Sequence, residues 1–249
     1  MNLERHGELA VLVMNTGKAN AISAEFIRQL DRARDEFAKS DARALVVTGY
    51  DRFFSAGLDL PSLVGLERPE LGDFVRRFDA AMLRWWDLPR PVVAAINGHA
   101  IAGGCVIALQ ADLRIMADGP GRIGLAEVSL GIGLPASVME TLRAQVPSSS
   151  LGPIALEGRL LAPRDALALG LVHEVVAPEA LQERALARAR ELAALPPAAF
   201  AMIKASIRRP VTERVRSNVE HETAAWLTTW FSPEARSRVA AQVARLTKA

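Results

Sequence analysis

Two short stretches of small residues are the strongest candidates for chemistry in this sequence. The first is FFSAGLDL, residues 53–60, and the second is INGHAIAGGC, residues 96–105. Small side chains let a ligand approach the main chain, and amides at the start of a helix point outward without a partner. Two such amides from separate loops, aimed at one oxygen, would form an oxyanion hole for a carbonyl that gains negative charge.

Two other interpretations compete with an oxyanion hole at these loops. A phosphate-binding loop would also use glycines and free amides, but no Lys-Ser or Lys-Thr pair follows them. Ala-Gly and Gly-Gly pairs also occur where a helix simply packs tightly on a sheet. The loops by themselves therefore leave catalysis and packing both open.

The elements that would position these loops alternate between strand and helix. Apolar runs typical of buried strands occur at 9–14, 44–48, 92–96, 113–117 and 172–176. Helical spacing or helix-start signals occur at 23–37, 71–87, 103–111, 163–169, 179–195, 197–207, 212–231 and 233–246. The alternation predicts an α/β fold with parallel strands, an α/β core at 1–195 and a helical region at 196–249, divided at Pro196-Pro197.

Composition indicates an ordinary globular protein and excludes several functional classes. Of 249 residues, 50% are hydrophobic and 23% charged, and Lys plus Arg exceed Asp plus Glu by only 30 to 28. The single cysteine excludes an intramolecular disulfide, and four scattered histidines give no metal-ligand spacing. No run approaches the roughly 18 apolar residues of a membrane span, and we find no signal peptide. We expect a soluble cytoplasmic protein with no nucleic-acid, membrane or metal partner.

A family resemblance gives the two loops a common purpose. FFSAGLDL joined to VVAAINGHAIAGGCVIALQADLRIMA resembles the crotonase (enoyl-CoA hydratase/isomerase) superfamily, and the resemblance runs from the turn at Lys18 to the carboxy-terminal helices. It implies a crotonase-like (ClpP/crotonase) spiral of ββα units with a helical trimerisation region. It also implies an acyl-CoA thioester substrate, no cofactor besides the CoA of that substrate, and a homotrimer or dimer of trimers.

The resemblance also assigns the site residues. The Leu58 and Gly103 N–H groups would hold the thioester oxygen, and Asp59 would orient its loop. Residues expected at the substrate are Lys18, Ala19, Asn20, Ser55, Ala56, Gly57, Asp59, Leu60, Ala102, Gly104 and Ala126. Lys18 either touches a CoA phosphate or is solvated.

The glutamate pattern selects a reaction. Hydratases of this superfamily use two glutamates, but the positions that match them here are Val106 and Glu127. A single mobile base can move a proton from the α-carbon to the γ-carbon of a dienolate, whereas adding water is easiest with two groups. The sequence therefore looks most like the mitochondrial-type 3-enoyl-CoA to 2-enoyl-CoA isomerases, with Glu127 as proton shuttle. We expect Leu125, Val128 and Leu130 to raise its pKa.

Several alternatives remain at this point. A hydratase is the nearest rival, and a non-catalytic RNA-binding relative is the rival from another class, although no basic run with interleaved aromatics supports it. We interpret His99 as a packed turn residue and Cys105 as a buried thiol. An apolar stripe formed by Trp226, Trp230 and Phe231 serves core or trimer packing, or else lines an acyl pocket.

Overall fold

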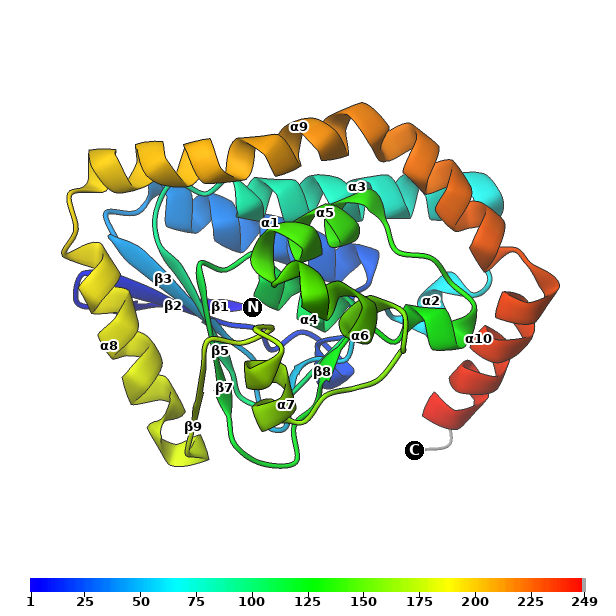
Figure 1. Cartoon of the computed structure of the whole chain (residues 1–249), viewed down its shortest axis with the longest axis horizontal. Helices are drawn as coiled ribbons and strands as arrows, with labels where there is room; N and C mark the ends of the chain where they lie inside the picture. Colours follow the sequence, from blue (N-terminus) through cyan, green and yellow to red (C-terminus); the bar gives the residue numbers. More distant parts are fainter. Residues whose placement is uncertain (248–249) are drawn as a thin grey trace.

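Two β-sheets and a shell of helices form the computed structural model, which describes residues 1–247 (Figure 1). The larger sheet has the strand order β1-β2-β3-β5-β7-β9, in which only β1 and β2 pair antiparallel. Its strands are β1 (Asn2–His6), β2 (Leu9–Val13), β3 (Ala44–Thr48), β5 (Val92–Ile96), β7 (Leu113–Ala117) and β9 (Glu174–Val176). The predicted parallel α/β core is confirmed.

Helices cover both faces of this sheet, which explains why β2, β3 and β5 are nearly continuous apolar runs. Side chains alternate between the faces along each strand. In β5, Val93 and Ala95 pack beneath α8 (Leu181–Ala193), while Val92, Ala94 and Ile96 face the main core on the other side. That main core also receives buried side chains from α1 (Ala24–Lys39), α3 (Arg68–Trp86) and α4 (Gly103–Leu109).

A second, three-stranded parallel sheet escaped prediction. It consists of β4 (Phe53–Ser55), β6 (His99–Ile101) and β8 (Ile123–Gly124), with Ser55 paired to Ala100 and Ile101 paired to Gly124. Each small strand directly follows a strand of the large sheet, so strand, strand and helix recur along the chain as the predicted ββα units. The second sheet brings both glycine loops to one edge.

The remaining helices complete the shell. They are α2 (Leu60–Leu63), α5 (Ala136–Gln145), α6 (Leu151–Ala155), α7 (Pro163–Ala168), α9 (Pro197–Trp230) and α10 (Pro233–Leu246), with short 3₁₀ turns η1 (Lys18–Asn20), η2 (Glu127–Leu130), η3 (Ser148–Ser150) and η4 (Pro178–Ala180). Serine side chains cap α1 and α10: Ser23 Oγ accepts from Phe26 N, and Ser232 Oγ accepts from Ala235 N. The domain division at 195/196 stays a prediction.

The long helix α9 corrects the prediction of two helices at 197–207 and 212–231. It continues through Pro210, although proline removes one helical hydrogen bond and usually breaks or kinks a helix. Packing on both sides of the proline compensates: Lys204 and Arg208 are buried before it, and Val211 and Val215 lie after it in a buried cluster with Trp86 of α3. In Figure 1, α9 runs along the top and then bends down to α10.

A buried ion cluster fastens the first half of α9 to the core. The Asp112 carboxylate binds Lys204 Nζ at 2.7 Å and Arg208 Nη2 at 2.6 Å. Arg208 also donates to the carbonyls of Trp86, at the end of α3, and Gln110, after the end of α4. A cation is favourable at helix carboxyl ends, where the backbone carbonyls lack partners. The cluster thus joins three helices and the large sheet.

Candidate active site

The two glycine loops follow β4 and β6, and they lie against each other at the carboxyl ends of these two strands. Gly57 has φ +84°, a left-handed conformation, and a Cβ added there would lie 2.7 Å from the Ile101 carbonyl oxygen and 3.2 Å from Gly103 N. A Cβ on Gly103 would lie 3.8 Å from Leu58 N. Only glycine lets the chains approach so closely at position 57. The approach of a ligand to these loops stays a prediction.

The Leu58 and Gly103 amides are both free to donate. Ile22 N donates to Gly57 O at 2.8 Å and Asp59 N donates to Ile22 O at 3.1 Å, so the Leu58 amide between them faces the other way. Gly103 is the first residue of α4, where the helix supplies no acceptor for its N–H. Neither amide has an acceptor within residues 1–247. Two neighbouring free donors suit an oxygen that gains charge.

Backbone strain marks the turn that leads into Gly103. Ala102 has φ 53° and ψ −119°, a conformation that residues with a side chain rarely adopt. Its N–H donates to Gly124 O at 2.8 Å and its carbonyl accepts from Val106 N at 3.1 Å, which hold the turn in place. Such strain costs about 1–3 kcal/mol and is concentrated at functional sites. The turn is therefore a second indication that these loops are built for chemistry.

Glu127 is the first residue of η2 and follows β8. Its side chain is half-buried as a whole, but Oε2 is inaccessible and has no hydrogen-bond partner within residues 1–247. Burial raises the pKa of Glu127 to about 7, although hydrogen bonds from the backbone amides of Glu127 and Ala126 oppose the rise. The predicted direction is confirmed. Leu125 is buried as expected, but Val128 is 46% exposed, so its predicted contribution is wrong.

Electrostatics connect Glu127 with the second glycine loop. Burial, and after it the negative charge of Glu127, raise the pKa of the Cys105 thiol. Cys105, the third residue of α4, is fully buried. Its interpretation as a buried thiol is confirmed. Val106, the next residue, is also buried. The carboxylate of Glu127 and the start of α4 therefore belong to one neighbourhood.

The first loop is held by hydrogen bonds from the side chains of Asn20 and Ser55, two of the predicted site residues. Asn20 is fully buried, and its side chain donates to Met14 O at 2.7 Å and Phe54 O at 3.0 Å while accepting from Thr16 N at 2.8 Å. Ser55 Oγ donates to Asn20 O at 2.8 Å and accepts from Gly57 N at 3.2 Å. These two side chains shape the loop rather than face a ligand.

The other predicted substrate residues fall into four groups. Ala19 and Ala56 are joined by a main-chain hydrogen bond of 3.0 Å, and the Ala19 amide also donates to Tyr50 Oη, a contact with no signal in the sequence. Lys18 is exposed. The Asp59 carboxylate makes no hydrogen bond within residues 1–247, so its main chain, not its side chain, fixes the loop. The last group lies within one or two positions of Leu58, Gly103 or Glu127 in the sequence. Its members are the partly exposed Ala102 and Ala126 and the buried Gly104 and Leu60.

The aromatic residues singled out in the sequence are packing residues in the structure. Trp226 and Trp230 stack at 5.1 Å between ring centroids and lie in the main core, with 2% and 1% exposure. Phe231 is partly buried beside them. His99 lies in β6 rather than in a turn, and its ring packs on Phe53 at 5.4 Å.

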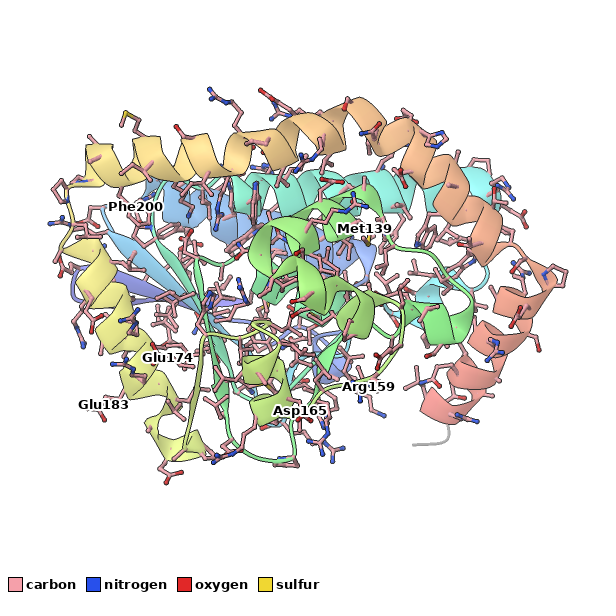
Figure 2. The ribbon with its side chains drawn as sticks, in the orientation of Figure 1. Met139, Arg159, Asp165, Glu174, Glu183 and Phe200 are labelled. Atoms are coloured by element: carbon pink, nitrogen blue, oxygen red, sulfur yellow. The ribbon has the colours of Figure 1, made fainter. Side chains whose placement is uncertain are left out.

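Other features give weaker grounds for a site. A Gly-x-Gly-x-x-Gly spacing occurs at 119–124, but it joins β7 to β8 and opens no helix, unlike a dinucleotide-binding loop. A groove of ≈ 550 Å³ is lined in part by Phe200, Lys204 and Arg208. The charges of Lys204 and Arg208 are already paired with Asp112, so they are poor candidates for binding an anionic ligand. Figure 2 labels Phe200 at the α8 end of α9, across the molecule from α10.

Among residues 1–247, no three His, Cys, Asp or Glu side chains gather in a way that could hold a metal ion. No helix in the same range combines the length and the apolar character needed to cross a membrane.

Comparison with known proteins agrees with the geometry. Residues 4–240 match the family model described as enoyl-CoA hydratase/isomerase. A probable enoyl-CoA hydratase of Rhizobium meliloti (strain 1021) is 29% identical, over 98% of this chain and 94% of the relative. Another probable enoyl-CoA hydratase, from Mycobacterium avium (strain 104), is 33% identical over 82% of this chain and 79% of the relative. The crystal structure of human mitochondrial delta3-delta2-enoyl-CoA isomerase matches with a TM-score of 0.92 and 27% identity, over 99% of this chain and 98% of that chain.

Proposed function

The chain belongs to the enoyl-CoA hydratase/isomerase family, and on that premise we propose that it converts 3-enoyl-CoA to the conjugated 2-enoyl-CoA. The observation that carries the proposal is the buried, unpartnered Oε2 of Glu127 in the neighbourhood of α4, the helix that begins at the free Gly103 amide, with Val106 at the position of a second glutamate. One base and one oxyanion hole are what this reaction requires.

The reaction begins when Glu127 takes the proton from C2 of the acyl chain. The electron pair of the broken C–H bond moves toward the thioester carbonyl, whose oxygen becomes an enolate. Donors at Leu58 and Gly103 stabilise that charge, and one donor of this kind contributes about 3 kcal/mol or slightly more. The glycines of both loops let the two loops pack closely, which brings the Leu58 and Gly103 amides near each other.

The reaction ends on another carbon of the same dienolate. Glu127, now protonated, returns the proton to C4, the C2–C3 double bond forms and the carbonyl is restored. A pKa of about 7 suits both halves, because the group is ionised often enough to act as base and its acid form readily gives the proton back. No water is consumed and no second carboxylate is needed.

A hydratase is the second candidate, and the names of the two bacterial relatives favour it. Two incubations separate the reactions. Under our proposal, a 3-enoyl-CoA gains the ultraviolet absorbance of a conjugated thioester, while a 2-enoyl-CoA in water keeps it. Rapid loss of absorbance from the 2-enoyl-CoA, with little conversion of the 3-enoyl-CoA, would overturn the isomerase assignment in favour of the hydratase.

We extend the proposal to the assembly, as a homotrimer or a dimer of trimers. Exposed apolar side chains on the first half of α9 support it: Met202, Ile203 and Ile207 are 66%, 54% and 68% exposed. Light scattering after size-exclusion chromatography tests it, since a monomeric mass would contradict the proposal. Coenzyme A enters as part of the substrate, and the cytoplasmic location stays a prediction.

A further inference from the structure

The loop that carries Glu127 is closed by its own main chain and then anchored from outside. Gly131 N donates to Val128 O at 3.0 Å and Ile132 N donates to Glu127 O at 3.1 Å, which closes the turn after the glutamate. The carboxylate oxygen Oε2 itself has no partner within residues 1–247. Its position therefore depends on the main chain beneath it.

A threonine of α9 supplies an anchor from a distant part of the sequence. Gly133 N donates to Thr229 Oγ1 at 2.9 Å, and Thr229 Oγ1 donates to Trp226 O at 2.7 Å. Because the hydroxyl proton points to its own helix, a lone pair of the oxygen stays directed at the Gly133 amide. The hydroxyl is thus oriented on both sides.

Helix α10 supports the same loop. Gly131, at φ +75°, lies so close to α10 that a Cβ added there would be 3.3 Å from Ala235 Cα. Arg238 Nη1 donates to Ser129 O at 3.3 Å. The carboxy-terminal helices therefore contact the loop at 129, 131 and 133, and all three contacts reach main-chain atoms.

We propose that Thr229 is a positioning residue for Glu127, holding the loop so that the carboxylate serves both reacting carbons. The proposal rests on the proposed function, because a shuttle must reach two atoms from one main-chain position and small displacements reduce its rate sharply. Thr229 touches no substrate in this scheme. It acts only through the hydrogen bond to Gly133.

Three variants test the proposal. Thr229→Val removes the hydroxyl and keeps the shape, Thr229→Ser keeps the hydroxyl, and Thr228→Val is the matched control. Thr228 is an exposed neighbour on the same helix whose hydroxyl bonds only to Ala224 O, at 2.9 Å. We expect Thr229→Val to lower kcat about tenfold with KM changed less than twofold, while the other two variants stay close to wild type.

The pH profile adds a measurement that a merely structural role would not move. In Thr229→Val the acidic limb of kcat should move to lower pH, because a displaced carboxylate meets water. Around Glu127, Cys105 of α4 is a buried thiol and Arg238 of α10 is bound to Ser129 O, so burial governs the pKa of the glutamate. Wild-type kcat and profile in Thr229→Val, or equal losses in Thr228→Val or Thr229→Ser, would overturn the proposal.

A readout without turnover separates this proposal from the proposed function. Infrared difference titration of each protein against its Glu127→Gln counterpart reports the pKa of that carboxyl directly. If wild type isomerises no 3-enoyl-CoA, the proposed function fails, and the titration still decides whether Thr229 positions Glu127. A lower pKa in Thr229→Val, but not in Thr228→Val, supports the positioning role, and an unchanged pKa in both contradicts it.

Discussion

The main chain of Gly104 passes so close to Ser55 that a Cβ on the glycine would lie 2.3 Å from the Ser55 carbonyl oxygen. The neighbouring Gly103 differs, since the nearest atom to its added Cβ would be Ile22 Cδ1 at 2.7 Å, the end of a flexible side chain. A side chain at position 104 would therefore clash with rigid backbone, whereas a side chain at position 103 would meet a methyl group that can move.

Substitution of the two glycines should therefore have unequal effects on stability. We expect Gly104→Ala to lower the free energy of unfolding by more than about 3 kcal/mol, because the two loops must separate, and Gly103→Ala by about 1 kcal/mol. Chemical denaturation of both variants measures the difference. Equal losses would show that the contact between Gly104 and Ser55 does not limit the fold.

Glu127→Gln should abolish isomerisation and leave ligand binding in place. Glutamine keeps the shape of the side chain but cannot accept the C2 proton, and a general base contributes about 10²–10⁴-fold. We expect kcat to fall within or beyond this range, while calorimetry finds the Kd of a saturated acyl-CoA within threefold of wild type. Residual activity above a tenth of wild type would place the base elsewhere.

Glu127 should also make stability depend on pH. Its folded pKa of about 7 exceeds the usual 4.5, so the native state keeps the proton to higher pH than the unfolded chain does. Stability is then lost as the pH rises from about 4.5 to 7. Glu127→Gln should gain stability over wild type across this window, by up to about 3 kcal/mol above pH 7, and little at pH 4.

Asp79 provides a matched control away from the site. It is buried, its Oδ1 accepts from Ser137 N at 3.1 Å, and burial raises its pKa from 3.8 to about 6. Asp79→Asn should therefore show the same sign of effect with a window that closes near pH 6. Identical pH curves for the two variants, or no change with pH in Glu127→Gln, would contradict the assignment of a raised pKa to Glu127.

Val106→Glu should add hydration to the activity. The new carboxylate would lie one residue beyond Cys105 in the same neighbourhood as Glu127, where it could activate a water molecule. We expect hydration of 2-enoyl-CoA to rise at least tenfold over wild type, and Val106→Gln, of nearly equal size, to give no rise. A similar rise with glutamine would attribute the change to space rather than to a second base.

Loss of the Asp112 charge should loosen α9. Lys204 and Arg208 are buried and share this one carboxylate, so Asp112→Asn leaves two buried cations without a counter-charge. Breaking a buried pair in this way costs about 3–5 kcal/mol. Glu25→Gln, which removes the exposed partner of Arg28, should leave the free energy of unfolding almost unchanged, because water screens an exposed pair. Urea unfolding that gives the two variants similar losses would contradict the structural role of the cluster.

The strands β2, β3, β5 and β7 of the large sheet could be predicted because they contain apolar runs such as Val92–Ile96, which is buried on both faces. The edge strand β1 was missed, because its sequence NLERH is polar and mostly exposed. The small sheet could not, because strands of two or three residues such as Ile123–Gly124 leave no periodic pattern. The prediction of two helices at 197–207 and 212–231 failed, because buried contacts of Arg208 before Pro210 and of Val211 after it hold one continuous helix.

In the candidate site, too, some residues could be predicted from the sequence and others could not. Leu58, Gly103 and Glu127 were indicated by motifs, because amides and an acid can be placed by family spacing. Thr229 could not be indicated, since it meets Gly133 across 96 residues of sequence and contacts only its main chain. Asn20 was assigned to the substrate, whereas its side chain is occupied by three bonds within its own fold.

The placement of the Leu58 and Gly103 N–H groups also bears on how this protein can change over generations. A donor that belongs to the peptide unit survives almost every exchange of the side chain attached to it, and proline alone deletes it. Alanine scanning would pass over both positions as unremarkable, apart from the steric effect at the glycine. Under the proposed function, descendants of such a chain can acquire new reactions when the acids around these two carbonyl-binding amides change.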